Sequence, residues 1–353
     1  MSSEVLNIYT KTVGPGYPVF IVAEAGSNHN GSYETAVELI DAAADAEVDA
    51  VKFQTFKAVR LYPRGAGTSD YLGSETPIYD IIEAMEMPAD WLPALRDHAH
   101  ERGLAFLSSP FHEEAVELLM PFVDAFKIAS YELTHAPLLE AVAKTGKPVE
   151  ITTGASTLAE VRVAIETLHR AGNYALVVLQ CTAAYPAPLE AANVRAVQTL
   201  ARELDVLTGL SDHTRDPTAA PMAATALGAV LIEKHFTLSN QLAGPDHAFA
   251  VEPDELARLV QGVRRTEAVL GSGEKSVHAA EEELRHFARR SIFTTRAIGR
   301  GERFSRDNVD ILRHGKLDSG LAPDRLGEVL RSKAARDIAA ETALRVEHLL
   351  EAE

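Results

Sequence analysis

The chain has almost no cysteine and no long hydrophobic segment. Cys181 is the one cysteine among 353 residues, which excludes a disulfide within the chain and is typical of proteins from a reducing compartment. The opening residues, MSSEVLNIYTKTVGPGYP, lack the apolar core of a signal peptide, and no apolar segment approaches membrane-spanning length. We therefore expect a cytoplasmic protein that does not interact with membranes.

Basic residues are also scarce. The sequence has 34 Lys and Arg against 51 Asp and Glu, a formal net charge of -17 at pH 7, and no Lys/Arg-rich run. A nucleic-acid-binding protein needs a broad basic face for the phosphate backbone, so this class is disfavoured. An anionic ligand could still bind, but only in a local basic pocket.

Eight short apolar, β-branched-rich segments recur along the first two-thirds of the chain. Each is typical of a strand buried on both faces, and amphipathic stretches with helical spacing lie between most of them. This alternation favours a closed (β/α)8 TIM barrel over an open doubly wound sheet. The expected strands are residues 19–23, 50–53, 104–107, 125–128, 149–152, 176–180, 206–210 and 229–233, and the clearest expected helices are 33–45, 89–102, 136–145, 158–170 and 193–204.

Two regions depart from the alternation. Residues 55–90 are too long for an ordinary strand-to-helix connection, so we expect a loop over the barrel mouth that is partly helical near 78–85. After the barrel, which should span residues 1–273, we expect a linker over 274–290 and a small β-rich domain over 291–353. A weak internal echo between residues 296–304 and 336–344 suggests two similar turns in that domain.

Lysines and hydroxyls occur where the predicted strands end, and in a TIM barrel this is the face that carries the chemistry. Lys52 and Lys127 lie within apolar strands, where burial of an ammonium group is costly unless an anion or a carboxylate meets it. Two lysines with several hydroxyls form a suitable cradle for phosphate and carboxylate groups. We interpret them as the local basic pocket.

His213 and His235 follow the adjacent strands seven and eight. A single histidine is usually a core or loop residue, but two on neighbouring strand ends beside Asp212 and Glu233 are a candidate metal pair. A structural zinc site normally has four protein ligands, so two imidazoles favour a catalytic, partly hydrated ion. We expect Mn²⁺, with Mg²⁺ or Co²⁺ as alternatives.

A series of motifs resembles the sialic acid synthase family, whose members make N-acetylneuraminate, legionaminate or pseudaminate. Residues 289–293 and 296–304 resemble the small antifreeze-like (SAF) domain that follows the barrel in this family. The motifs are IVAEAGSNHNG at 21–31, DAVKFQT at 49–55, FLSSPF at 106–111, FKIASYEL at 126–133, CTAAYP at 181–186, GLSDHT at 209–214, EKHFT at 233–237 and GPDH at 244–247.

The resemblance implies an enzyme that condenses phosphoenolpyruvate with an open-chain N-acetylated amino hexose, using a divalent metal and releasing phosphate by C–O cleavage. It also implies a domain-swapped homodimer in which Arg313 reaches the sugar site of the other subunit. By the same resemblance, His213 and His235 bind the metal, and Glu24, Glu132 and Lys127 lie at the reacting centre. The residues that it implies for phosphoenolpyruvate are Lys52, Ser109, Lys127, Ser130, Thr152 and Ser211. Those that it implies for the sugar are Gln54, Glu132, Tyr185 and Asp246.

Several positions depart from the family pattern. Thr152 stands where serine is common, Ala183 stands where sialic acid synthases can have asparagine, and Glu341 replaces a turn glycine. Arg313 is followed by His-Gly rather than Pro-Gly, and residues 129–132 favour the pseudaminate and spore-coat branches. Two alternatives stay open: a deoxy-octulosonate or deoxy-heptulosonate synthase acting on a phosphorylated sugar, and a non-catalytic sugar- or ice-binding protein.

Overall fold

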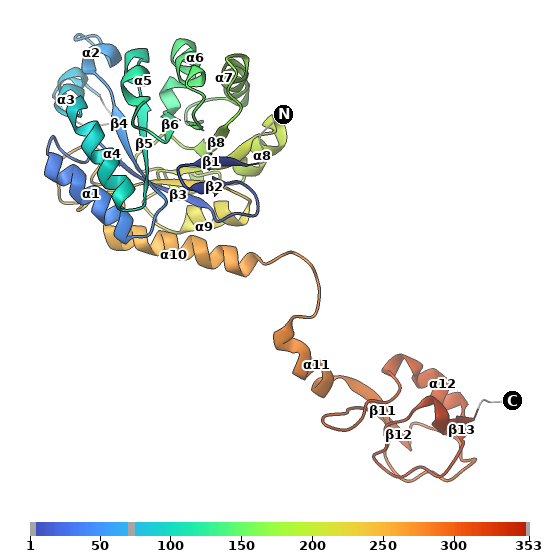
Figure 1. Ribbon diagram of the computed structural model, residues 1–353. Coiled ribbons are helices and arrows are strands. Elements are labelled where there is room, and N and C mark those ends of the chain that lie inside the picture. The colour runs from blue at the N-terminus through green and yellow to red at the C-terminus, as the bar shows by residue number, and fades with distance from the viewer. Residues whose placement is uncertain (1–4, 70–74, 351–353) are drawn as a thin grey trace. The chain divides into compact units, whose positions relative to one another are not determined.

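The chain divides after Gly271 into two compact units (Figure 1). The computed structural model describes residues 5–69 and 75–350. Residues 70–74 of the expected mouth loop and 351–353 of the expected small domain lie outside them. The expected linker belongs to the second unit, where it contains the 3-10 helix η4 (Ala279–Glu281) and the helix α11 (Glu282–Ala288).

The first unit contains a closed parallel barrel, which confirms the predicted TIM-barrel architecture. Its strand order is β10-β3-β4-β5-β6-β7-β8-β9, so neighbours in sequence are neighbours in the barrel and β10 closes against β3. The observed strands begin or end within a few residues of the predicted ones. They are β3 (Phe20–Gly26), β4 (Ala50–Thr55), β5 (Ala105–Pro110), β6 (Ala125–Ile128), β7 (Val149–Thr152), β8 (Leu176–Cys181), β9 (Leu207–Asp212) and β10 (Leu231–His235).

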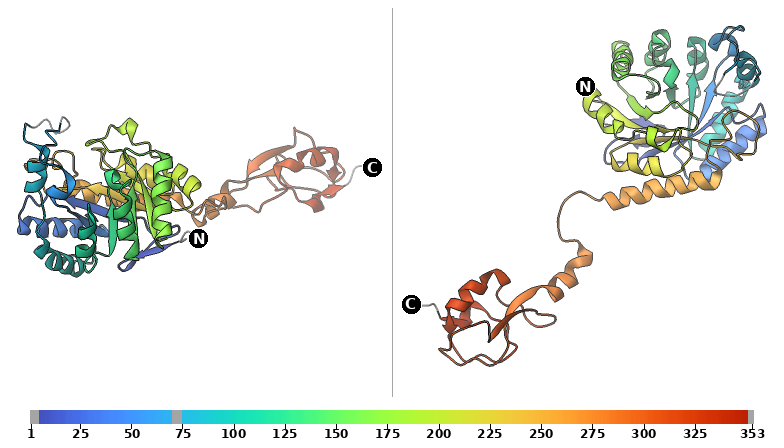
Figure 2. Two further views of the ribbon diagram at one scale, coloured as in Figure 1. Left: turned by 90° about the horizontal axis from the view of Figure 1, so that it is seen from above. Right: turned by 180° about the vertical axis from the view of Figure 1, so that it is seen from behind.

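Helices form the layer outside the strands, as both Figure 1 and the view from behind in Figure 2 show. Their apolar faces pack on outward-facing strand residues such as Phe53, Phe106 and Phe126. Among the described residues, no helix is long and apolar enough to cross a membrane. The main helices of this layer are α1 (Tyr33–Asp45), α4 (Leu92–Glu101), α5 (Glu113–Leu119), α6 (Ala136–Lys144), α7 (Leu158–Arg170), α8 (Ala196–Leu204), α9 (Ala219–Ala226) and α10 (Pro253–Leu270).

The inside of the barrel is apolar at the N-terminal ends of the strands. An unpredicted hairpin, β1 (Leu6–Ile8) and β2 (Lys11–Val13), packs Leu6, Ile8 and Val13 into one cluster with inward residues such as Phe20 and Val22. Strands of three residues are too short for a periodic signal, which is why the sequence did not predict them. The hairpin covers this apolar end of the barrel. The polar interior residues lie toward the C-terminal ends of the strands.

The long connection after β4 is partly helical, as predicted. It contains α2 (Ala58–Leu61) and α3 (Ile78–Ala84), and the 3-10 helix η1 (Ala89–Trp91) leads into α4. Glu86 ties its two ends together, since its carboxylate accepts from Lys57 Nζ at 2.6 Å and from the backbone N–H of Ala58 at 2.7 Å.

The second unit confirms the internal echo. The two similar segments pair with each other, because the backbone groups of Ile298 and Ile338 exchange hydrogen bonds of 2.9 and 2.8 Å. Gly301 has φ +83° and its counterpart Glu341 has φ +57°, so a non-glycine residue holds the left-handed turn. The elements are β11 (Arg290–Thr294) with β12 (Val309–Arg313), β13 (Lys333–Ala334) with β14 (Leu349–Leu350), α12 (Leu326–Arg331), η5 (Pro323–Arg325) and η6 (Val346–His348).

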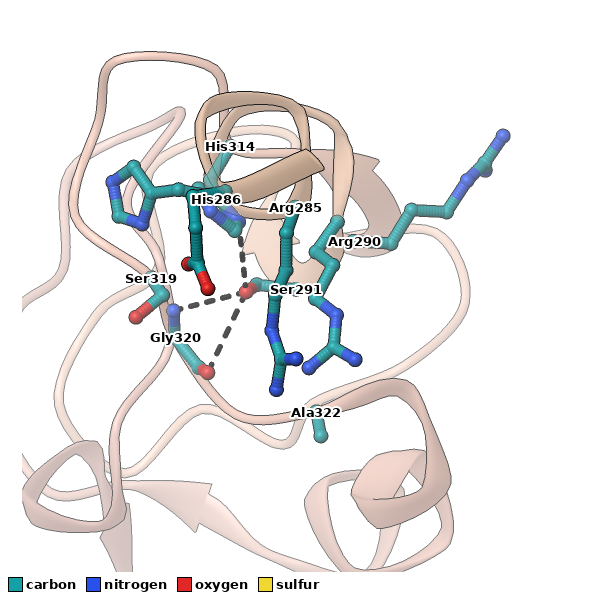
Figure 3. A pocket seen from close by; sticks show the side chains of 10 residues that line it. Arg285, His286, Arg290, Ser291, His314, Ser319, Gly320 and Ala322 are labelled. Carbon is teal, nitrogen blue, oxygen red and sulfur yellow. Dashed lines mark hydrogen bonds between the residues drawn. The ribbon is translucent and has the colours of Figure 1, made fainter. Parts of the chain in front are cut away.

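A cavity of about 370 Å³ lies in this unit between α11, β11 and the segment after β12. Figure 3 shows Ser291 at its centre, where Oγ accepts from the Gly320 N–H at 3.0 Å and lies 3.5 Å from His314 Nδ1. His314, which stands where the family pattern has proline, is buried there, and its ring is 5.2 Å from that of His286. His314, which replaces the proline of the family pattern, therefore has a packing role in this unit.

Candidate active site

Two lysines and two glutamates form a buried charge network inside the barrel, toward the C-terminal ends of the strands. Lys52 Nζ lies 2.5 Å from Glu24 Oε2 and 3.5 Å from Glu233 Oε2. Lys127 Nζ donates to both oxygens of Glu233, at 2.6 and 2.7 Å. All four side chains are almost inaccessible to solvent. The two lysines predicted to form a basic pocket thus lie in one network, and each of them is paired with a carboxylate.

Mutual attraction keeps Lys52 and Glu233 ionised despite their burial. Burial alone would lower the pKa of Lys52, but the charges of Glu233 and Glu24 outweigh it and the pKa lies above its ordinary value. Burial likewise opposes ionisation of Glu233, yet the charges of Lys127 and Lys52 hold the pKa of that carboxyl well below its usual range. The ammonium group of Lys52 thus stays charged at neutral pH and can meet an anionic ligand.

Two of the hydroxyl residues proposed as phosphoenolpyruvate contacts, Ser211 and Ser109, lie beside the charge network. Ser211 donates to Glu233 Oε1 at 2.9 Å, and Ser109 Oγ lies 3.4 Å from Lys52 Nζ. Ser130 Oγ accepts from the Gly154 N–H at 3.1 Å, and a Cβ on Gly154 would lie 2.7 Å from that oxygen, so only glycine allows this approach. Thr152 differs from the others, because its hydroxyl donates to the carbonyl of Ile128 at 3.1 Å.

The two predicted metal ligands lie side by side. The rings of His213 and His235 have centroids 5.1 Å apart and an interplanar angle of 79°. His213 Nδ1 lies 2.9 Å from the carbonyl of Thr182. A carbonyl only accepts, so Nδ1 carries the proton and Nε2 keeps its lone pair. Burial first, and then the charge of His235, holds the pKa of His213 well below its ordinary value, so this imidazole is neutral.

Aromatic side chains line the histidine pair. Tyr185 stacks on His213 with ring centroids 4.2 Å apart, and Phe249 lies 5.3 Å from the ring of His235. Burial raises the pKa of the Tyr185 phenol, and the negative charges of Asp246 and Glu233 raise it further. Tyr185 therefore stays protonated and can act as a hydrogen-bond donor in the site.

Gly26 brings three of the predicted residues together. It sits at a bulge after Glu24 with φ +54°, a left-handed conformation that favours glycine. A Cβ placed there would lie 3.3 Å from Glu24, 3.4 Å from Gln54 and 3.6 Å from Asp246. Gln54 Nε2 also donates to Glu24 Oε1 at 2.7 Å, and Asp246 Oδ2 lies 3.5 Å from His235 Nδ1. The predicted sugar contacts Gln54 and Asp246 thus converge beside Glu24.

Glu132 lies on the 3-10 helix η2 (Ser130–Glu132), directly after β6. Burial raises the pKa of its carboxyl to about 7. Its Oε2 is buried and accepts no hydrogen bond from the described residues. A carboxyl group in this state can exchange a proton near neutral pH, which is what general acid–base catalysis requires.

Within the barrel unit, the structure places one sequence-identified residue away from the histidine pair and adds another residue to the site. Asp212 faces Lys234 at 2.6 Å rather than the histidine pair. Arg313 ends β12 in the second unit with its side chain exposed. Glu150, which sequence reasoning missed, is fully buried in β7 beside Lys127. The sequence pattern that could have identified Glu150 is the one used for Lys52, namely a charged residue within an otherwise apolar strand.

Comparison with known proteins matches both units. The NeuB family matches residues 39–275 and the SAF domain residues 289–350. The barrel with its lysine, glutamate and histidine site thus belongs to a class of enzymes related to sialic acid synthases, as the motifs implied. The chain is a member of the NeuB family and carries a C-terminal SAF domain.

Named relatives align over almost the whole chain. It is 44% identical to the spore coat polysaccharide biosynthesis protein SpsE of Bacillus subtilis, over 96% of this chain and 95% of that protein. It is 38% identical to the N,N'-diacetyllegionaminic acid synthase of Legionella pneumophila, over 96% of this chain and 97% of that one. The structure of the N-acetylneuraminic acid synthetase from Leptospira borgpetersenii has a TM-score of 0.72 and 31% identity, over 80% of this chain and 95% of that one.

Proposed function

We propose that this protein is a nonulosonic acid synthase that condenses phosphoenolpyruvate with the open-chain form of an N-acetylated amino hexose. The observation that carries the proposal is the buried pair Lys52 and Lys127 beside the histidine pair, inside one barrel. The acceptor is N-acetylmannosamine or a diacetamido-trideoxyhexose, the sugars that lead to the products of this family. The reaction belongs to the transferases.

Phosphoenolpyruvate carries a phosphate and a carboxylate, and both need cations or strong donors. Lys52 and Lys127 supply the charge, and the hydroxyls of Ser109, Ser130 and Ser211 supply neutral contacts. The glutamates that now hold the lysines keep them in place before substrate arrives. An incoming anion then shares the ammonium groups without a large rearrangement, which favours a well-oriented complex.

The histidine pair fits a divalent ion. His213 Nε2 has only the weak partner Cys181 Sγ, at 3.9 Å, and the buried His235 Nδ1 makes no hydrogen bond within the described residues, with Asp246 Oδ2 3.5 Å away. Within residues 5–69 and 75–350, no group of three or more His, Cys, Asp or Glu side chains could hold a metal, so the pair leaves positions open for oxygen ligands. A bound Mn²⁺, Mg²⁺ or Co²⁺ would polarise the aldehyde oxygen of the sugar as a Lewis acid.

The proposed reaction forms one carbon–carbon bond and breaks one carbon–oxygen bond. Carbon three of phosphoenolpyruvate attacks the aldehyde carbon, water adds to carbon two, and phosphate leaves with its bridging oxygen. Gln54 and Asp246 orient the sugar hydroxyls beside Glu24. The carboxylate of Glu24 is already engaged by Lys52 and Gln54, so we assign the proton of the attacking water to Glu132.

This assignment predicts a pH dependence of kcat. A general base works in its ionised form, so kcat should rise as the pH passes through about 7, where Glu132 loses its proton. Glu132→Gln should lower kcat by about 10²–10⁴-fold and remove that rise. Steady-state rates between pH 5.5 and 9 measure both effects. Glu166→Gln, on the exposed face of α7, is the matched control, and an unchanged rise in Glu132→Gln would show that another group is the base.

The proposal includes the swapped homodimer implied by the family resemblance. Arg313 belongs to the second unit and its side chain is exposed on β12, so it is available for a contact with a sugar bound in the other subunit. Mixing the inactive variants Arg313→Ala and Lys127→Met would then restore part of the activity, because some mixed dimers contain one intact site.

A substrate panel tests the proposed function. Purified protein is incubated with phosphoenolpyruvate, Mn²⁺ and, in turn, N-acetylmannosamine, the two diacetamido-trideoxyhexoses and phosphorylated sugars, while phosphate release and product mass are followed. Phosphate release with one free amino sugar, abolished by EDTA, supports the proposal. Turnover only with a phosphorylated sugar would instead indicate a deoxy-octulosonate or deoxy-heptulosonate type of synthase.

A further inference from the structure

Glu150 is a buried carboxyl group to which the mechanism above gives no role. It lies in the middle of β7, in register with Lys127 of β6 on one side and Val177 of β8 on the other. Its neighbours Val149 and Ile151 face the outer apolar layer, so the Glu150 side chain faces the barrel interior. The residue is 0% exposed, and neither carboxyl oxygen accepts a hydrogen bond from any described residue.

The lysines that face Glu150 are already paired with other carboxylates. Lys127 comes from β6, Lys52 from β4, Glu24 from β3 and Glu233 from β10, while its β8 neighbour is the apolar Val177. Glu233 takes Lys127 at 2.6 Å, and Glu24 takes Lys52 at 2.5 Å. Three carboxyl groups thus share two ammonium groups. An ionised carboxylate without a partner in such a place is very unfavourable, so the geometry favours the protonated acid.

We propose that Glu150 is a positioning residue for the phosphoenolpyruvate cradle, which binds its substrate anion only while Glu150 is protonated. The inference rests on the proposed function and deepens it. When Glu150 is neutral, it does not attract Lys52 and Lys127, so both ammonium groups can interact with a substrate anion at the barrel mouth. Ionised Glu150 attracts the same two ammonium groups from inside the barrel and adds a negative charge next to a substrate that is itself a trianion.

The proton equilibrium of Glu150 falls in a working range of pH. Burial, and then the charge of Glu233, raises the pKa of Glu150 to about 8, against the opposing effect of Lys127 and Lys52. Binding of phosphoenolpyruvate should therefore weaken as the pH rises past about 8. Glu132 governs kcat on the acid side, whereas Glu150 governs substrate affinity on the alkaline side, so the two effects are separable.

The first experiment measures binding of phosphoenolpyruvate by calorimetry in the absence of any sugar, between pH 6.5 and 9.5. The dissociation constant of the wild-type protein should rise by about tenfold for each pH unit above about 8, as expected when one proton must be present for binding. In Glu150→Gln, which mimics the neutral acid, the dissociation constant should stay level. An equal alkaline rise in both proteins would overturn the proposal.

The second experiment needs no substrate. A carboxyl group whose pKa is higher in the folded than in the unfolded protein destabilises the fold as the pH rises from its unfolded value, 4.5, toward its folded value, about 8. The Tm of Glu150→Gln should therefore exceed that of the wild type by a margin that widens between pH 5 and 8. A margin of the opposite sign that grows with pH would show an ionised, paired Glu150 and would overturn the inference.

The two experiments together distinguish this inference from the proposed function. A widening Tm margin without phosphoenolpyruvate binding at any pH would contradict the proposed function, and with it the role of Glu150 toward that substrate. Substrate binding with a level Tm margin and equal alkaline rises would leave the proposed function standing and contradict the role of Glu150. Glu166→Gln should match the wild type in both measurements, since this side chain is exposed on α7.

Discussion

Lys127→Met should lower the affinity for phosphoenolpyruvate by about 10²–10³-fold, which corresponds to the loss of a buried, charge-assisted contact of about 3–4 kcal/mol. The reason is that Lys127 is one of the two cations in the proposed cradle, and methionine keeps the length of the side chain without the charge. Calorimetric titration with phosphoenolpyruvate measures the effect. Lys147→Met, whose Nζ contacts only the carbonyl of Val123 among the described residues, serves as the control.

A second substitution separates binding from stability. Lys127→Met removes a cation that holds both oxygens of Glu233, and breaking a buried pair typically costs about 3–5 kcal/mol. Adding Glu233→Gln removes most of the uncompensated charge, so the double variant should regain much of the lost Tm. It should not regain affinity for phosphoenolpyruvate. A double variant that binds the substrate like the wild type would contradict the proposed cradle.

His235→Ala should abolish stimulation by Mn²⁺ and lower kcat by about 10³-fold. Electrophilic activation by a metal contributes several kcal/mol to transition-state stabilisation, and each 1.36 kcal/mol is a factor of about ten in rate. The protein would supply only two imidazole ligands, whose ring centroids are 5.1 Å apart. Removal of one of them should therefore also abolish tight metal binding. Electron paramagnetic resonance of added Mn²⁺ measures that loss directly.

The exposed His278 provides the matched control for this prediction. It lies next to η4, outside the barrel, and His278→Ala should keep the metal affinity and the kcat of the wild type. If His235→Ala also keeps both, the metal does not bind at the histidine pair. If it keeps the metal but loses kcat, His235 acts on the substrate rather than as a ligand.

The fold was largely predictable because each barrel strand is a short apolar run. Few fold architectures accommodate an alternation of such runs with amphipathic stretches, and eight repeats of the alternation are typical of a closed barrel. The hairpin of β1 and β2 was not predictable, since its strands have three residues each. Its burial depends on apolar contacts with Phe20 and Val22 across the barrel end, which no local pattern encodes.

The site was predictable in its composition and less so in its pairings. Reactive side chains at strand ends meet at one face of any barrel, which brought Lys52, Lys127 and the histidine pair together. Which carboxylate each lysine meets depends on register and depth, and the sequence does not give these. Asp212 therefore looked like a neighbour of the histidines, although it pairs with Lys234. Glu150 was missed although it is a charged residue within an apolar strand, and its burial without a hydrogen-bond partner is seen only in the structure.

The most direct test of the account uses phosphoenolpyruvate labelled with ¹⁸O at the bridging oxygen, incubated with Mn²⁺ and the acceptor sugar that the panel identifies. Mass spectrometry of both products follows the label. We predict a keto acid with a nine-carbon backbone whose mass is the sum of the sugar and pyruvate, with the ¹⁸O in the released phosphate. Label retained in the organic product, or phosphate released without a new acid of this backbone, would contradict condensation with carbon–oxygen cleavage.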